Sequence, residues 1–157
     1  MSVAFTKESD SEAVAADLPD RPISAHSNLV TPAGLAALDA ELGSAKAAYA
    51  EAQAGGAISA DRTAMARATR DLRYWSSRRA SAQLIEAAVD GTVVFGATVT
   101  IEGDAGVRIW RIVGEDEADP KAGSISYVSP IAQALMGKAV DDAVSVGEHE
   151  LEVVTIA

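Results

Sequence analysis

Two stretches of helix-spaced apolar residues, separated by a pair of glycines, constrain this chain more than any other feature. Between residues 35 and 52 the apolar positions recur at alternating spacings of three and four, which is typical of a coiled-coil seam. Thr31 and Pro32 precede the seam and favour a helix start, since Thr caps exposed amides and Pro is tolerated at the first helical position. Gly55 and Gly56 end the helix. The seam consists of Leu35, Leu38, Leu42, Ala45, Tyr49 and Ala52.

A second apolar stripe follows the glycine pair, and either Ser59 or Asp61 could cap its helix. The link between the two stripes is short, so the pattern predicts an antiparallel helical hairpin. Each arm would hold about 26 residues and extend roughly 35–40 Å. The second stripe consists of Met65, Ala68, Leu72 and Trp75.

The pattern changes at Gly91 from helical spacing to β-branched runs and alternating residues. A short helix begins at Ser129-Pro130 and ends near Gly137, with Ile131 and Leu135 expected to support the fold. We therefore predict an α+β protein whose second half is a small, twisted antiparallel sheet with one helix. The expected strands are 92–95, 98–101, 108–113, 123–127, 143–146 and 151–154.

Composition excludes several classes of site. The chain has no cysteine and only two histidines, His26 and His149, so neither a thiolate centre nor a convincing metal site is expected. The formal net charge of −10 argues against non-specific duplex binding. No apolar run reaches the roughly 18–20 residues of a membrane span, and the first residues lack a signal-peptide core. We expect a monomeric cytoplasmic protein with no membrane partner.

We expect three regions along the chain. Residues 1–28 show no sustained periodicity and contain scattered acids and prolines, which predicts a flexible extension. Residues 29–89 form the coiled-coil hairpin, and residues 90–157 form the β domain.

Three sequence segments of the second half carry a family resemblance. Residues 94–99 (VFGATV), 111–119 (RIVGEDEAD) and 126–138 (SYVSPIAQALMGK) resemble, in this order, segments of the GreA/GreB transcription elongation factors. The resemblance covers about residues 29–157. It implies an FKBP-like C-terminal domain that docks on the rim of the bacterial RNA polymerase secondary channel, while the coiled coil enters that channel.

The resemblance also implies where the chain would act. Polymerase docking is assigned to Ser129, Pro130, Gln133 and Lys138 of the short helix. In the family, two acidic residues at the coiled-coil tip help to hold a second Mg²⁺ that activates water for cleavage of backtracked RNA. The chain itself is expected to need no cofactor, and any Mg²⁺ contact would lie within the polymerase active site.

The tip of this chain departs from the family pattern. The tip residues are Gly55, Gly56, Ser59 and Asp61. In one register Ala64 stands where the family has the second acid, and in the other the functional positions fall nearer residues 57–61; either register leaves one carboxylate. Asp61 alone supplies weak affinity for Mg²⁺, and it is also well placed as a helix cap. We therefore expect weak or absent transcript cleavage, as in the Rnk-type relatives with shortened coils.

Arginines gather on the second helix. Arg67, Arg70 and Arg78, with Tyr74 between them, fall on one face at spacings of three and four. This basic face is either a solvated helix surface or a contact for nascent RNA phosphates and acidic channel walls.

Several alternatives remain open at this point. The chain could be a true cleavage factor using Asp61. It could instead be an FKBP-like module, including a prolyl isomerase, although few aromatics are present to line such a pocket. A third alternative is a coiled-coil adaptor for another protein.

Overall fold

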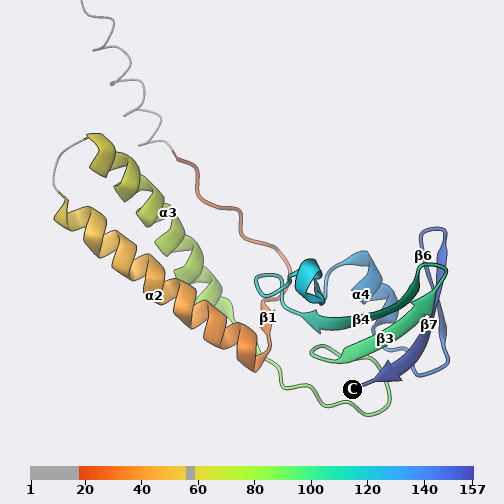
Figure 1. Ribbon diagram of the computed structural model, residues 1–157. Helices are drawn as coiled ribbons and strands as arrows, with labels where there is room; N and C mark the ends of the chain where they lie inside the picture. The colour runs from red at the N-terminus through yellow and green to blue at the C-terminus, as the bar shows by residue number, and fades with distance from the viewer. Residues whose placement is uncertain (1–17, 56–58) are drawn as a thin grey trace, which may run out of the picture. The chain divides into compact units, whose positions relative to one another are not determined.

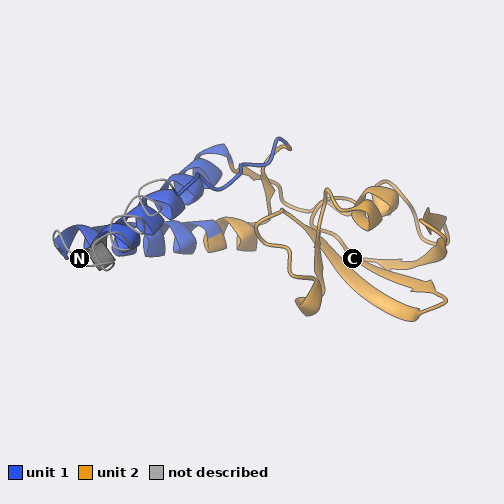
Figure 2. Cartoon of the chain, turned by 90° about the horizontal axis from the view of Figure 1, so that it is seen from above, with its two compact units in different colours: residues 1–25, 38–81 blue, residues 26–37, 82–157 orange. Residues whose placement is uncertain are grey.

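The computed structural model describes residues 18–55 and 59–157. The chain divides into two compact units (Figure 2): a helical unit of residues 1–25 and 38–81, and a β unit of residues 26–37 and 82–157. Residues 26–37 and 82–89 therefore belong with the β unit, although the sequence pattern places most of them with the hairpin.

Two helices of equal length build the hairpin (Figure 1): α2 (Pro32–Ala54) and α3 (Ser59–Ser81), each of 23 residues. At 1.5 Å per residue each is about 34 Å long, slightly shorter than expected. Leu38, Ala45 and Ala68 are buried, which confirms the predicted seam. Arg79 Nε lies 2.5 Å from Asp39 Oδ1 and ties α3 to α2.

The start of α2 follows the sequence signal. The Gly34 amide donates to Thr31 Oγ1 at 3.0 Å, so the Thr31 side chain satisfies one of the amides that the first turn leaves unpaired. The predicted cap of the first helix is confirmed.

The β unit contains a five-stranded sheet in the order β5-β4-β3-β7-β6. Its pairs are antiparallel except one, because β4 and β5 run parallel. The α+β class is confirmed, but the sheet is mixed rather than antiparallel. The strands are β3 (Thr98–Gly103), β4 (Gly106–Val113), β5 (Ser124–Ser126), β6 (Ala143–Val146) and β7 (His149–Ile156).

The parallel pair results from the connection between its strands. After Val113 the chain passes through an acidic turn and the 3-10 turn η1 (Pro120–Ala122) before β5 begins. This crossover returns the chain to the same end of β4, and Arg111 then lies in register with Ser124.

The expected first strand, residues 92–95, is not a strand. Only Thr92 makes an isolated bridge, to Ala139. The Val93 amide and carbonyl bond instead to Lys138 and Gly137, beyond the end of the short helix. Residues 93–95 are apolar because the segment is buried and not because it is a strand: Val93 and Phe95 are 1% and 5% exposed in the core.

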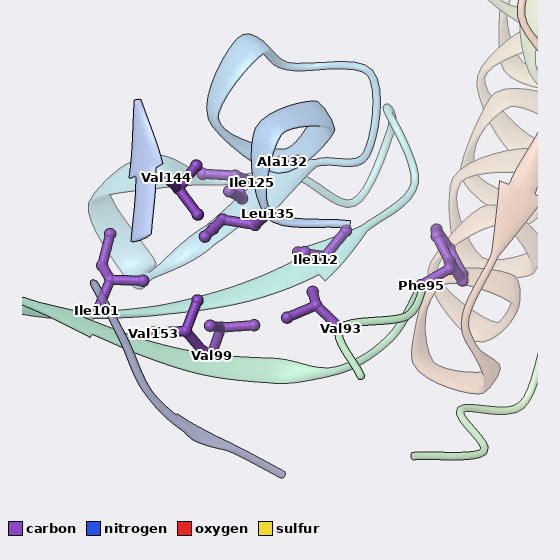
Figure 3. Close-up of a cluster of buried hydrophobic side chains, with 10 residues drawn as sticks. All are labelled: Val93, Phe95, Val99, Ile101, Ile112, Ile125, Ala132, Leu135, Val144 and Val153. Atoms are coloured by element: carbon purple, nitrogen blue, oxygen red, sulfur yellow. The ribbon is translucent and has the colours of Figure 1, made fainter. Parts of the chain in front are cut away.

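One core fills the space between the sheet and α4 (Pro130–Leu135), as Figure 3 shows. Leu135 and Ala132 of the helix are fully buried in it, and Trp110 and Tyr127 pack against it. The Phe95 and Tyr127 rings meet edge to face with centroids 5.7 Å apart. The burial of Leu135 and the packing of Ile131 against the cluster confirm their expected supporting roles. The buried cluster contains Val93, Phe95, Val99, Ile101, Ile112, Ile125, Ala132, Leu135, Val144 and Val153.

A second, two-stranded sheet was not expected from the sequence. β1 (Leu29–Val30) pairs in parallel with β2 (Gln83–Leu84). The Gln83 amide donates to Asn28 O at 2.8 Å, and the Ile85 amide donates to Val30 O at 2.9 Å. These bonds join the chain entering α2 to the chain leaving α3.

None of the helices in the described ranges is long and apolar enough to cross a membrane.

Candidate functional site

The tip of the hairpin is only partly described. Gly55 follows the end of α2, and Gly56 lies outside the described residues. Ser59 is the first residue of α3, which places the Asp61 backbone within the first helical turn. The side chains of Ser59 and Asp61 also fall outside the described part, so the predicted tip contacts stay predictions.

The arginines of α3 do not form one uniform exposed face. Arg67 is exposed, Arg70 is partly buried, and Arg78 is only 2% exposed. The helical spacing correctly places them along one side, but burial removes Arg78 from the surface that a phosphate could reach. Arg62 and Arg73, which flank that side, are exposed.

The segment before the hairpin is ordered along α3 rather than extended freely. The Arg21 guanidinium lies 3.8 Å from the Tyr74 ring centroid and 5.2 Å from that of Trp75. Arg21 Nη1 also lies 3.5 Å from Asp71 Oδ1, and Arg73 Nη1 donates to Asp20 Oδ1 at 3.2 Å. The sequence predicts a flexible extension over residues 1–28, whereas the structure holds Asp20 and Arg21 against α3; residues 1–17 lie outside the description.

The sequence signal for docking of this segment on α3 lies in its prolines and its arginine, not in the helical periodicity. Pro19 and Pro22 restrict the backbone around Arg21 to extended conformations. A cationic side chain in such a segment can make a cation–π contact with an aromatic ring, and Tyr74 and Trp75 of α3 supply such rings.

The α4 surface carries the predicted docking residues. Ser129 caps the helix, its Oγ accepting from the Ala132 amide at 3.4 Å. Pro130, Gln133 and Lys138 are exposed, and Gln133 Nε2 donates to Tyr127 O at 2.6 Å. Pro130 and Gln133 lie in α4, Ser129 caps it, and Lys138 follows three residues after its end.

The acidic turn after β4 supports the entry to α2. Thr31 Oγ1 donates to Glu117 Oε2 at 2.6 Å, and Arg111 Nη1 lies 3.6 Å from Glu117 Oε1. Thr31 itself is 1% exposed. Glu117, in the turn at residues 115–119, thus holds the start of α2.

Close backbone packing reinforces this junction, which we call the neck (residues 26–34 and 83–85). A Cβ placed on Gly114 would lie 2.3 Å from Leu29 O, so only glycine fits there. The Tyr127 hydroxyl donates to Ser27 O at 2.5 Å. The last residues of the predicted extension, 26–28, are thus built into the β unit.

An apolar hollow of about 240 Å³ opens between α4 and the far ends of the β3–β4 and β6–β7 hairpins. Ile101, Ile131 and Leu151 contribute to it, with Arg108 and His149 among its polar residues. Of the described residues that line it, only Trp110 is aromatic. This lining lacks the several aromatic walls that the prolyl isomerase hypothesis requires.

Acidic and histidine side chains do not gather into a metal site. Among residues 18–55 and 59–157, no group of three or more such side chains is close enough to hold an ion. Two acids of the turn at 115–119 make side-chain contacts: Glu117 with Thr31 and Arg111, and Asp119, whose Oδ1 accepts from the Lys121 amide.

The second half of the chain matches a known family. Residues 88–157 match the model described as "Transcription elongation factor, GreA/GreB, C-term". "Transcription elongation factor GreA" of Ralstonia nicotianae is 48% identical over 86 residues, covering 49% of this chain and 54% of that protein. Its namesake from Legionella pneumophila is 49% identical over 73 residues, covering 43% and 46%. The chain spans about half the length of the curated relatives it matches.

Among solved structures, the "GreA factor homolog 1 (Gfh1)" protein of Thermus thermophilus aligns with 84% of this chain and 99% of its own. The sequence identity is 22% and the TM-score is 0.40, which does not by itself establish a shared arrangement. The sequence matches are the stronger finding, and the match to the family model, residues 88–157, lies within the β unit and includes α4. Residues 88–157 are thus similar in sequence to the C-terminal domain of the GreA/GreB transcription elongation factors.

Proposed function

We propose that this protein binds bacterial RNA polymerase and regulates transcription elongation from the secondary channel, with weak or absent stimulation of transcript cleavage. The observation that carries the proposal is the sequence similarity to transcription elongation factor GreA, 48% identity over 86 residues, together with the family match at residues 88–157. It acts as a monomeric cytoplasmic accessory factor rather than as an enzyme in its own right.

Docking on the polymerase is assigned to α4. Pro130, Gln133 and Lys138 are exposed, and the Ser129 cap fixes the first turn of the helix. Leu135 on the opposite side is fully buried, so the exposed residues are held on a rigid support. A rigid, preorganised surface loses less conformational entropy on binding than a flexible loop does.

Weak cleavage is proposed from the composition of the tip. Between residues 55 and 64 the only acidic residue is Asp61. Mg²⁺ prefers several oxygen ligands in an octahedral arrangement, and one carboxylate contributes little to holding it. That ion would belong to the polymerase active site, because two-metal chemistry needs a metal already bound by the enzyme.

A cleavage factor using Asp61 is the second candidate, because Asp61 lies in the first turn of the helix that follows the tip. Stalled, backtracked elongation complexes separate the two candidates. Our proposal expects little RNA shortening above the polymerase alone, and no further loss with Asp61→Ala. Robust shortening that disappears in Asp61→Ala would establish the second candidate instead.

Polymerase binding is tested by co-elution with the core enzyme on size exclusion. We expect the wild type and Lys121→Glu to co-elute, and Lys138→Glu to be weakened, since both residues are exposed lysines in the same unit. Loss of binding in both variants would indicate general electrostatics rather than α4 docking. Recovery of a different partner from lysate, without polymerase subunits, would favour an adaptor.

A further inference from the structure

An extended segment, residues 18–23, runs beside α3 (Figure 1). It lines two grooves together with arginines of that helix. The segment and α3 both lie in the helical unit, and the segment precedes the part of the chain that matches the GreA/GreB family. We call this segment the strap. The arginine surface consists of Arg62, Arg70 and Arg73, which line one groove together with Leu18 and Asp20.

Two grooves show how far the strap follows the helix. Leu18 and Asp20 line a groove of about 360 Å³ together with α3 residues from Arg62 to Arg73. Residues 20, 21 and 23 line a second groove, of about 230 Å³, with α3 residues from Arg70 to Ser77. The strap therefore runs beside α3 for roughly four helical turns.

The contacts of the strap combine opposite charge with aromatic stacking. Asp20 pairs with Arg73, a member of the arginine surface. Arg21 reaches the Tyr74 ring and Asp71, and Asp71 also lies 3.6 Å from Arg70 Nε. Arg21 thus anchors the strap, while Asp20 supplies the negative charge that an RNA phosphate would otherwise bring.

Docking of the strap costs little conformational entropy. Pro19 and Pro22 fix two of its six backbone φ angles before it docks. A short segment with this restriction can be held by two cation–π contacts and two ion pairs, each of which contributes modestly. Contacts of this strength allow the strap to be displaced.

We propose that the strap is an intramolecular cover that closes the arginine surface against polyanions, with single-stranded RNA as the partner that the surface fits. The strap and RNA phosphates compete for Arg73 and for access to Arg70. RNA binds only the fraction of molecules in which the strap has lifted, which lowers its apparent affinity by that fraction. The proposal rests on RNA contact by these arginines and does not require polymerase binding.

The test compares Arg21→Ala with Lys121→Ala in the full chain. Both substitutions remove one positive charge, and Lys121 is exposed in the β unit. Long-range electrostatics alone predicts that both variants bind a polyanion slightly more weakly than the wild type. Release of the strap predicts the opposite sign for Arg21→Ala only.

Binding is measured by anisotropy of a fluorescein-labelled single-stranded RNA at fixed low salt. We expect Arg21→Ala to bind about three- to tenfold more tightly than Lys121→Ala, the range set by the anchoring contacts that it removes. Adding Arg73→Ala to Arg21→Ala is expected to abolish the gain. Equal or weaker binding by Arg21→Ala, or no RNA binding by that variant, would overturn the proposal.

Strap release has a second readout that needs no RNA. Arg21 lies against Trp75, so its removal is expected to increase acrylamide quenching of tryptophan fluorescence, while Lys121→Ala leaves quenching unchanged. Trp110 is present in both variants and contributes a constant background. Identical quenching in the two variants would show that Arg21 does not hold the strap on α3 in solution. That result would contradict the proposed cover.

Discussion

The two units of this protein bury side chains in different ways. The β unit holds a continuous cluster of large aliphatic and aromatic residues between its sheet and α4. In the described part of the helical unit, the buried hydrophobic residues are Leu38, Ala45 and Ala68, two of them alanines. The hairpin relies more on close helix approach and on side-chain ion pairs such as Arg79–Asp39.

This difference bears on which parts of the chain can change in evolution. A packed core penalises most substitutions, because each side chain touches many others. A two-helix hairpin with a thin seam leaves most of its residues exposed, where substitutions are nearly neutral. The family model matches residues 88–157, which lie within the β unit, and the tip with its single acid lies in the hairpin.

The contrast in side-chain burial is tested by making the same Leu→Ala substitution in each unit and comparing the losses of stability. Leu135→Ala removes a fully buried side chain from the core and is expected to lower the free energy of unfolding by about 2–5 kcal/mol. Leu42→Ala, at a half-exposed seam position, is expected to cost about 1 kcal/mol. Urea titrations followed by circular dichroism and tryptophan fluorescence measure both. Equal losses would contradict the contrast between the units.

Glycine substitutions test backbone packing in the same two units. Gly114→Ala places a methyl group 2.3 Å from Leu29 O in the neck, which should cost about 1–3 kcal/mol of stability. Gly43→Ala lies inside α2 with nothing within 4 Å, and it should stabilise by about 0.5–1 kcal/mol. Thermal unfolding measures whether each substitution raises or lowers the melting temperature. A Gly114→Ala variant as stable as the wild type would mean that the backbone of the neck moves away from the added methyl group without loss of stability.

Thr31, at the start of α2, tests how much a single side-chain hydroxyl in the neck contributes to stability. Thr31→Val removes both the cap of α2 and the hydrogen bond to Glu117, with an expected loss of about 1–2 kcal/mol. Thr155→Val, an exposed position on β7, is the matched control and should change stability by less than about 0.5 kcal/mol. Similar losses in both variants would show that the Thr31 hydroxyl is not a special contact.

The hairpin and most of the sheet could be predicted because their signals are local. The seam at Leu38 and Ala45, the Thr31 cap and Gly55 each act within one or two helical turns. The β-branched runs at 98–101 and 108–113 likewise mark their own strands. Local periodicity and turn residues decide such elements before any tertiary contact forms.

The parts that sequence analysis missed depend on partners far along the chain. Residues 92–95 have strand composition, yet Val93 finds its backbone partners beyond α4. Glu117 belongs to a turn whose acids look solvated, yet its partner Thr31 is 86 residues away. Arg78 follows the spacing of an exposed face but is buried. Nothing in a single sequence encodes these distances directly.

The smallest expected effect concerns an exposed residue that belongs to neither core. The Asp90 carboxylate accepts from the Thr92 hydroxyl at 2.8 Å and from the Thr92 amide at 3.3 Å, and these bonds lower the pKa of Asp90. A hydrogen bond to the charged form favours ionisation, so a titration of the side-chain carboxyl by NMR should place this pKa below its ordinary value. Thr92→Val, which keeps the amide but loses the hydroxyl, should move the pKa back toward that value.

The sign of the linked stability follows from the direction of this shift. Because the folded-state pKa is lowered, the contribution is fully present above the ordinary aspartate pKa and disappears as the pH falls through the folded-state pKa. Any difference in stability between wild type and Thr92→Val should therefore be constant at neutral pH and shrink only below about pH 4. An Asp90 that titrates at its ordinary pKa in the wild type would show that these exposed hydrogen bonds do not persist in water. A core substitution such as Leu135→Ala, in contrast, removes packing that does not depend on protonation of this carboxyl, so its cost should remain through the same pH range.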